Sequence, residues 1–164
     1  MNAHEMAAAP GRAELAGAVY GSLLAASVVV GSATDHQPAP AEDLIVLLIC
    51  TGIVFWLAHV YAEVVAHVKT LTWANLRRVA REEWPLAQAS FPPATAAAFA
   101  STFGMSDTVA AWMALGVAVA SQVIWAVAAA VTIHSSKAVI LWSGVANLLL
   151  GLILVLLKTL IAGH

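Results

Sequence analysis

Long apolar runs separated by short polar segments dominate the chain. A transmembrane helix needs about 20 consecutive, mostly apolar residues. Four stretches meet this requirement easily, and a fifth meets it with two prolines near its middle. The predicted spans are residues 14–33, 43–68, 84–104, 108–133 and 138–161. The pattern therefore predicts an all-α fold, a polytopic transmembrane helical bundle that forms one domain over residues 1–164.

The stretch 84–104 decides between five spans and four. It carries no charged residue, but Pro92 and Pro93 interrupt it. Membrane helices tolerate proline when neighbouring groups satisfy the freed carbonyls, so a kinked span is one interpretation and a surface or re-entrant segment is the other. We favour five spans because Asp107 can cap the helix that follows. A four-span chain would also leave a long uncharged segment at the membrane surface.

Composition supports a membrane environment. The chain has 164 residues, of which 62% are hydrophobic and 10% are charged, and its mean hydropathy is +0.88. Soluble domains usually carry about 25% charged residues, and a chain of this size has too small a core to hide so much apolar surface. The net charge is −2, with no basic run that would indicate nucleic-acid binding. Arg12 and the apolar run after it resemble a signal peptide, but we interpret them as a retained first helix.

The basic residues predict the orientation. Lysine and arginine favour the cytoplasmic side of a membrane. The N-terminus and the 69–83 loop then lie inside the cell, and the acidic loop with Asp35, Glu42 and Asp43 lies outside. Five spans put the C-terminus outside, in a bacterial plasma membrane. The lipid bilayer is the expected partner, and a second copy or a subunit of a membrane complex is a further candidate.

The 69–83 loop itself predicts a short amphipathic helix on the inner membrane surface. Trp73 falls on an apolar side, while Arg77, Arg78 and Arg81 can reach lipid phosphates. Tryptophan and basic residues are enriched at that interface. We interpret these four residues as anchors; specific recognition of an anionic lipid is the alternative.

Small residues and amides predict how the helices pack. Membrane helices associate through close packing of small residues rather than through a hydrophobic effect. Gly17 and Gly21 form a Gly-x-x-x-Gly motif in the first helix. The short turn between the last two spans makes them antiparallel, which brings Gln122 and Asn147 to a similar depth. We predict a hydrogen bond between these amides that joins the two helices, with substrate contact as the alternative.

Three ionisable residues, His59, Glu63 and His67, interrupt the second span at intervals of four. We call this row the ladder. In a helix its rungs lie about 6 Å apart on one face, with Glu63 about 9 Å and His59 about 15 Å from the inner boundary. Such groups usually face the bundle interior or a water-filled cavity. With five spans, Glu14 and His134 lie at the same end and extend the cluster.

The ladder is compatible with several functions. Histidine and glutamate can exchange protons, so the row can carry protons or couple them to transport of a cation or small solute. A metal or haem site is a second alternative, although one ion cannot reach all three rungs because the outer two are about 12 Å apart. The third is a polar cluster in a structural or assembly subunit. We predict proton-linked transport and assign no metal site; the cofactor stays unknown.

Three segments resemble a group of uncharacterised small integral membrane proteins of actinobacteria. They read VFWLAHVYAEV, VAREEWPLAQA and SDTVAAWMALG. The resemblance implies a multi-pass helical protein and brings no known activity, substrate or catalytic residue. The chain contains no Gly-rich phosphate loop, paired cysteine or nucleophile elbow. We therefore expect a protein that is not an enzyme.

Overall fold

The computed structural model describes residues 10–33, 37–68, 70–132 and 137–162. Their regular structure is helical, so the all-α prediction is confirmed for the part of the chain described. The helices, in order, are α1 (Pro10–Gly31), α2 (Ala41–His67), α3 (Trp73–Glu82), α4 (Trp84–Gln88), α5 (Phe91–Thr102), α6 (Asp107–Thr132) and α7 (Lys137–Ala162).

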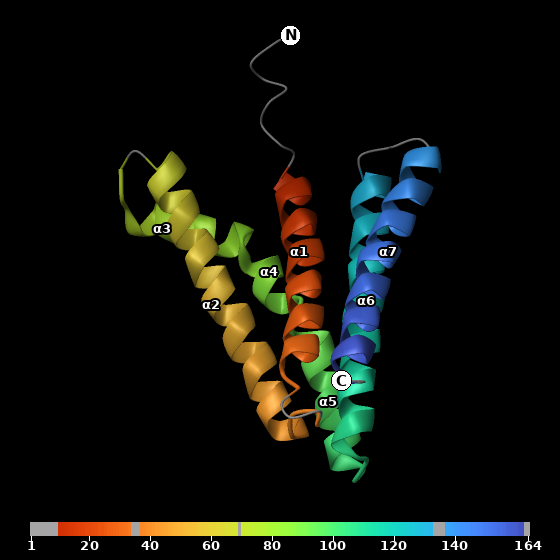
Figure 1. The fold of residues 1–164 in the computed structure, drawn as a ribbon. Coiled ribbons are helices and arrows are strands. Elements are labelled where there is room, and N and C mark those ends of the chain that lie inside the picture. Colours follow the sequence, from red (N-terminus) through yellow and green to blue (C-terminus); the bar gives the residue numbers. More distant parts are fainter. Residues whose placement is uncertain (1–9, 34–36, 69, 133–136, 163–164) are drawn as a thin grey trace.

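The long helix α1 lies at the centre of the arrangement (Figure 1). It packs against α2 and α4 on one side and against α6 and α7 on the other. The hairpin of α6 and α7 forms one arm of a V, and α2 with α3 forms the other arm (Figure 1). The segment α4–α5 descends from α3 toward the start of α6 and closes the narrow end (Figure 1).

Two of the described helices, α2 and α6, are long and apolar enough to cross a membrane. The described apolar stretches of α1 and α7, Leu15–Gly31 and Leu141–Leu156, fall short of that length. In this part of the chain, two helices rather than the expected five therefore meet the length and hydropathy that a membrane span requires. The clearest departure is the predicted span 84–104, which is divided into α4 and α5.

The prolines explain this division. Pro85 lies in the first turn of α4, and Pro92 and Pro93 lie in the first turn of α5. A proline has no N–H to donate and fits best where a helix begins, because the first-turn N–H groups lack intrahelical partners. The chain therefore ends one helix at Gln88 and starts another at Phe91, with a hydrogen bond from Ala94 N to Ser90 O of 3.2 Å. The predicted kink is a complete break.

The broken segment α4–α5 lies between α1 and α2 and packs closely against one glycine of each helix. A Cβ placed on Gly21 would overlap the carbonyl oxygen of Leu86 and lie 2.8 Å from Ala89 Cβ. A Cβ on Gly52 of α2 would lie 3.0 Å from Ser90 Cβ. A Cβ on Gly17 would meet Leu86 at an ordinary distance of 3.7 Å. The Gly-x-x-x-Gly face of α1 thus meets α4, and Gly21 makes the tighter contact.

The main apolar core lies toward the narrow end of the V. It contains Ala25, Val29, Leu48, Ala97 and Leu115, contributed by α1, α2, α5 and α6. Many of its members are alanines, which lets the backbones approach closely. This core holds the four helices together well away from the ladder end of α2.

Asp107 plays a different role from the one expected. We predicted it as the N-cap of α6, but Ser106 holds that position: its Oγ accepts from Val109 N at 3.3 Å. Asp107 Oδ1 instead accepts from the backbone N of Ala41, at 2.9 Å, in the first turn of α2. The carboxylate therefore ties the start of α6 to the start of α2 and satisfies a donor that α2 cannot pair internally.

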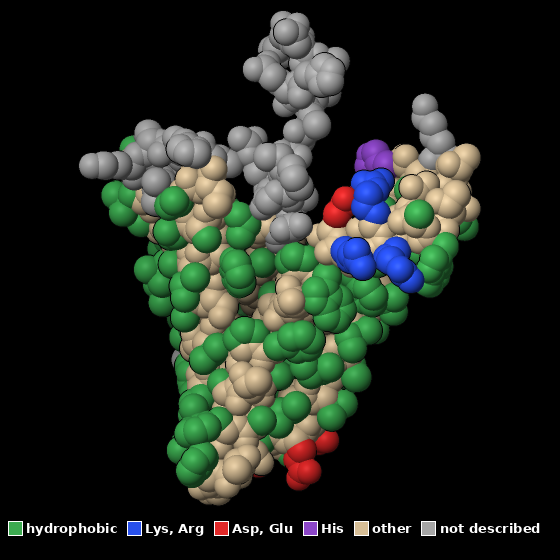
Figure 2. All heavy atoms as spheres, turned by 180° about the vertical axis from the view of Figure 1, so that it is seen from behind, with side chains coloured by type: hydrophobic (Ala, Val, Ile, Leu, Met, Phe, Trp, Pro, Cys, Tyr) green, Lys and Arg blue, Asp and Glu red, His purple; other side chains and the backbone are tan. Residues whose placement is uncertain are grey.

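Charge on the surface is concentrated at the two ends of the molecule. Figure 2 shows basic side chains at the end that carries α3, with acidic and histidine side chains beside them, and further acidic side chains at the opposite end. Between them the surface is mainly apolar (Figure 2). Large apolar residues are exposed there, including Val54 on α2 at 61%, and Trp142 on α7 at 70%.

Candidate functional site

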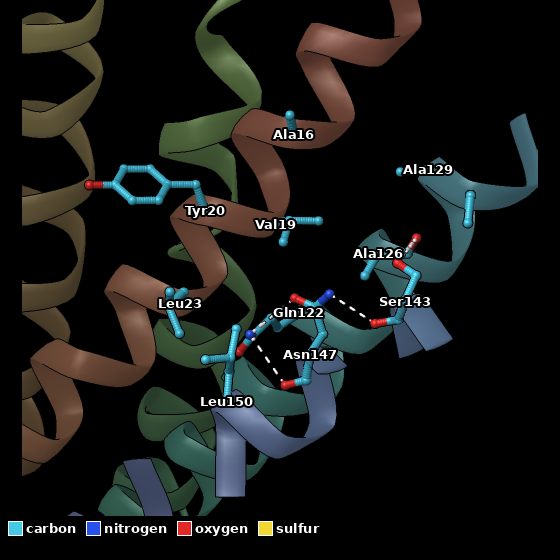
Figure 3. Close-up of a pocket in the computed structure, with 11 residues that line it drawn as sticks. Ala16, Val19, Tyr20, Leu23, Gln122, Ala126, Ala129, Ser143, Asn147 and Leu150 are labelled. Atoms are coloured by element: carbon cyan, nitrogen blue, oxygen red, sulfur yellow. Dashed lines mark hydrogen bonds between the residues drawn. The ribbon is translucent and has the colours of Figure 1, made fainter. Parts of the chain in front are cut away.

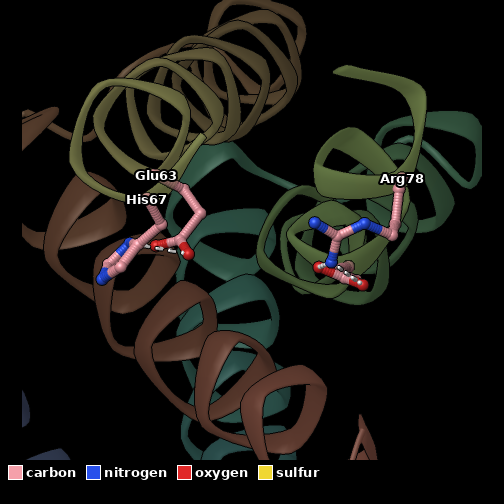
Figure 4. A network of polar contacts seen from close by, with 4 residues as sticks. Glu63, His67 and Arg78 are labelled. Atoms are coloured by element: carbon pink, nitrogen blue, oxygen red, sulfur yellow. Dashed lines mark hydrogen bonds and ion pairs between the residues drawn. The ribbon is translucent and has the colours of Figure 1, made fainter. Parts of the chain in front are cut away.

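Two residues of the ladder, Glu63 and His67, contact each other across one turn of α2. His67 Nδ1 and Glu63 Oε1 lie 2.9 Å apart (Figure 4). The side chain of Glu63 is 41% exposed and that of His67 is 70% exposed. Pairs of this kind contribute about 0.3–0.5 kcal/mol to a helix. The contact therefore adds little stability and leaves both groups accessible for proton exchange.

His59, the innermost rung, faces α1. Its Nδ1 lies 3.0 Å from the carbonyl oxygen of Phe55, one turn earlier. Its ring centroid lies 5.6 Å from that of Tyr20 on α1, with the rings tilted by 50°. His59 is half-buried, and this contact directs its side chain into the space between α1 and α2.

Glu83, between α3 and α4, joins this group from another part of the chain. Burial raises the pKa of the Glu83 carboxyl above its usual range. The neighbouring His59 opposes that rise in pKa, while the charge of Glu63 adds to it. Trp56 holds the α3–α4 junction close to α2, because its Nε1 donates to Ala80 O at 2.9 Å. Glu83 was not among the predicted site residues, because only the fold brings it near α2.

The wider predicted cluster is not fully described. Glu14 lies in the second turn of α1, and its side chain is outside the described part of the structure. His134 lies outside the described residues. Within the described ranges, no group of three or more histidine, cysteine, aspartate or glutamate side chains is arranged to hold a metal ion.

A crevice of about 440 Å³ opens between α1, α6 and α7 (Figure 3). The wall from α1 includes Ala16 and Tyr20, and the other walls are mainly alanine and leucine. Three polar side chains interrupt this apolar lining: Gln122 on α6, and Ser143 and Asn147 on α7. The sequence predicted a contact between Gln122 and Asn147, but it did not predict the crevice.

The side chains of Gln122 and Asn147 form a hydrogen bond across the hairpin, and Asn147 also bonds the backbone carbonyl of Ser143 (Figure 3). Gln122 Nε2 donates to Asn147 Oδ1 at 3.2 Å and to Asn147 O at 3.4 Å. Asn147 Nδ2 donates to Ser143 O at 3.0 Å. Gln122 is fully buried, and its Oε1 has no hydrogen-bond partner within the described structure. An unsatisfied buried acceptor costs about 1–3 kcal/mol.

Tyr20 belongs to both features. It lines the crevice, and its ring extends from α1 toward α2 (Figure 3). Its ring centroid lies 5.6 Å from that of His59. Residue counts along the helices agree with this placement. Gln122 and Tyr20 each lie ten residues from the end of their helix at the open side of the V, and His59 lies eight. At 1.5 Å per residue, all three are about 12–15 Å below that end.

The predicted amphipathic helix is present as α3. Thr72 caps it by accepting from Asn75 N at 3.3 Å. Arg77 lies over the ring of Trp73, 5.6 Å from its centroid, and Arg78 pairs with Glu82 at 3.1 Å (Figure 4). Arg81 and Trp73 are exposed, and Val79 supplies the buried contact. Their proposed role as membrane anchors stays a prediction.

Comparisons with known proteins give no relative: no family model, curated protein or solved structure matches the chain.

Proposed function

We propose that the chain is an integral membrane protein of five passes that moves protons through the ladder, linked to transport of a small solute. In this proposal α4 and α5 together form one broken pass. The ladder gives protons access from the cytoplasmic side to the interior of the bundle. The resemblance to small actinobacterial membrane proteins and a bacterial plasma-membrane location belong to the same proposal.

The surface supports the membrane part of this proposal. Apolar side chains exposed over a broad band are typical of a lipid-facing surface, since soluble monomers rarely expose large contiguous apolar patches. The basic helix α3 lies at one end of that band and the acidic first turns of α2 and α6 lie at the other (Figures 1 and 2). This asymmetry favours α3 on the cytoplasmic side. The N-terminus is then inside and the C-terminus outside.

The contact between His59 and Tyr20 is the observation that carries the proton-transport part. It connects the innermost rung to a residue that also lines the crevice. A row of titratable groups that leads from an exposed end toward a crevice between helices is an arrangement that a proton relay can use. The weak, exposed pair of Glu63 and His67 is suited to exchange protons with the aqueous phase.

The test replaces Glu63 with glutamine, which has nearly the same volume and cannot release a proton. Purified protein is reconstituted into vesicles that contain a pH-sensitive dye, and proton uptake is measured after a potassium diffusion potential is imposed. We expect proton uptake by the unmodified protein, and a rate of uptake that is lower by about tenfold or more in Glu63→Gln. Thermal stability should be unchanged, because the pair it breaks is weak.

Glu82→Gln is the matched control. Glu82 also takes part in an exposed i,i+4 pair, at 3.1 Å from Arg78, but lies on α3 rather than in the ladder. It should leave uptake unchanged. Uptake by the unmodified protein that equals that of protein-free vesicles would refute the proposal, as would equal uptake by Glu63→Gln.

A structural or assembly subunit is the second candidate. It is favoured by α7, whose described part exposes Leu141, Leu149 and Leu156 by more than half. Another membrane protein or a second copy could cover this face as well as lipid does. Cross-linking in native membranes from cysteines placed at Leu149 would capture such a partner.

A further inference from the structure

We propose that the crevice between α1, α6 and α7 is a binding site for an uncharged small molecule with an apolar body and one hydrogen-bond donor. Alcohols, phenols and amides of this shape belong to the class. The inference goes beyond proton movement along the ladder, because the site can bind its ligand whether or not the ladder conducts.

The size and lining of the crevice define the body of the ligand. Its volume of about 440 Å³ lies within the range of about 300–1,000 Å³ typical of small-molecule sites. Alanine, valine and leucine make up most of the walls, and none of the lining residues is charged. A charged ligand would lose its hydration without gaining a counterion there. An uncharged, largely apolar molecule fits these walls.

The polar end of the ligand is defined by Gln122. Its Nε2 faces two oxygens of Asn147, at 3.2 and 3.4 Å, which fixes the orientation of the amide. The opposite orientation would place oxygen against oxygen. Oε1 therefore remains an acceptor without a partner in a fully buried side chain. A ligand that brings a donor would satisfy this group, and one that lacks a donor would leave it unpaired.

The surroundings allow a ligand to reach that oxygen. Oε1 has almost no exposed surface, so a neighbouring side chain must move. Leu150 lines the same crevice and is 46% exposed, so it can change rotamer without disturbing the core (Figure 3). Asn147 stays in place meanwhile, because its amide also donates to Ser143 O. The site therefore closes around the donor while the hairpin contact is kept.

The test compares two probes that differ in one hydrogen-bond donor. 4-Pentylphenol has a donor, and 4-pentylanisole carries a methyl group in its place. Each is titrated into ¹⁵N-labelled protein in detergent micelles while the side-chain amide signals of Gln122 and Asn147 are followed by NMR. We expect saturable shifts with the phenol and binding of the anisole that is weaker by about tenfold or more.

Two variants separate binding in the crevice from partition into the micelle. Ala16→Leu fills the crevice from α1 without touching the amide contacts, and it should abolish the saturable shifts. Gln122→Met removes the acceptor at similar size, so the two probes should bind equally to it, as followed through Asn147. If Gln122→Met fails to fold, Ala16→Leu still decides the question.

Equal affinity of the two probes for the unmodified protein would overturn the inference, since the crevice would then accept any apolar chain, including a lipid tail. Shifts that never saturate, or that persist in Ala16→Leu, would also overturn it. Neither result bears on proton uptake by Glu63→Gln, so this inference and the proposed function fail independently.

Discussion

Gly21 should tolerate a methyl group far less well than Gly17, one turn earlier on the same helix. Both glycines face Leu86 of the broken segment. An added Cβ at Gly17 meets its nearest atom at 3.7 Å, an ordinary contact distance. At Gly21 it would lie 2.8 Å from Ala89 Cβ and overlap the carbonyl oxygen of Leu86. A backbone oxygen cannot rotate away as a side chain can, so α4 itself would have to shift.

The two Gly→Ala substitutions make a matched pair that isolates this contact. Each gains about 0.8–1 kcal/mol of helix propensity, and this term cancels in the difference between them. Overpacking of a close contact costs about 1–3 kcal/mol. Gly21→Ala should therefore be about 1–3 kcal/mol less stable than Gly17→Ala, which should equal or exceed the unmodified protein in stability.

The assay is reversible unfolding in detergent micelles, followed by circular dichroism and by tryptophan fluorescence. Trp84 lies at the start of α4, so its emission should change in Gly21→Ala and stay constant in Gly17→Ala. Equal stability of the two variants would refute the reasoning, because it would mean that α4 does not pack on Gly21 as described. A larger loss in Gly17→Ala would refute it as well.

Two further predictions concern topology and the tie between helix ends. A reporter that is active only in the cytoplasm, fused after His164, should show little activity if the chain crosses the membrane five times, and strong activity would favour four crossings. Asp107→Ala should lose about 0.5–2 kcal/mol of stability in thermal unfolding, because Ala41 N loses its acceptor, whereas Asp107→Asn keeps an acceptor oxygen and should lose much less. Equal losses in the two variants would show that the carboxylate acts only through its charge.

The sequence predicted the long helices well because their signal is local. The expected spans 43–68 and 108–133 lie within two residues of α2 and α6 at both ends. An apolar run of this length, bounded by polar or helix-breaking residues, leaves little choice of structure. The hydrogen bond from Gln122 to Asn147 was also within reach, because a short turn fixes the register of an antiparallel hairpin.

The features that sequence reasoning missed depend on contacts between distant segments. Pro92 and Pro93 signalled a disturbed helix, but whether the chain bends or breaks depends on what packs against it. Here Gly21 and Gly52 leave room for the interrupted segment between two helices. Asp107 was assigned to the helix that it begins, and it caps another helix 66 residues away in the sequence. No local sequence pattern connects Asp107 with Ala41, from whose backbone N–H it accepts a hydrogen bond.

The position of the break also explains why the candidate sites lie where they do. The helix α4 packs against α1 at Gly17 and Gly21, and beyond this contact Ala25, Ala26 and Val29 are buried in the main core. Another face of α1 receives less cover, and Ala16 and Tyr20 on it remain exposed. Buried polar groups are tolerated where ligand or water can reach them, and they are costly in a dry, close-packed core. The ladder and the crevice thus occupy the loosely packed end of the molecule, and Tyr20 links them because α1 stands between the two arms.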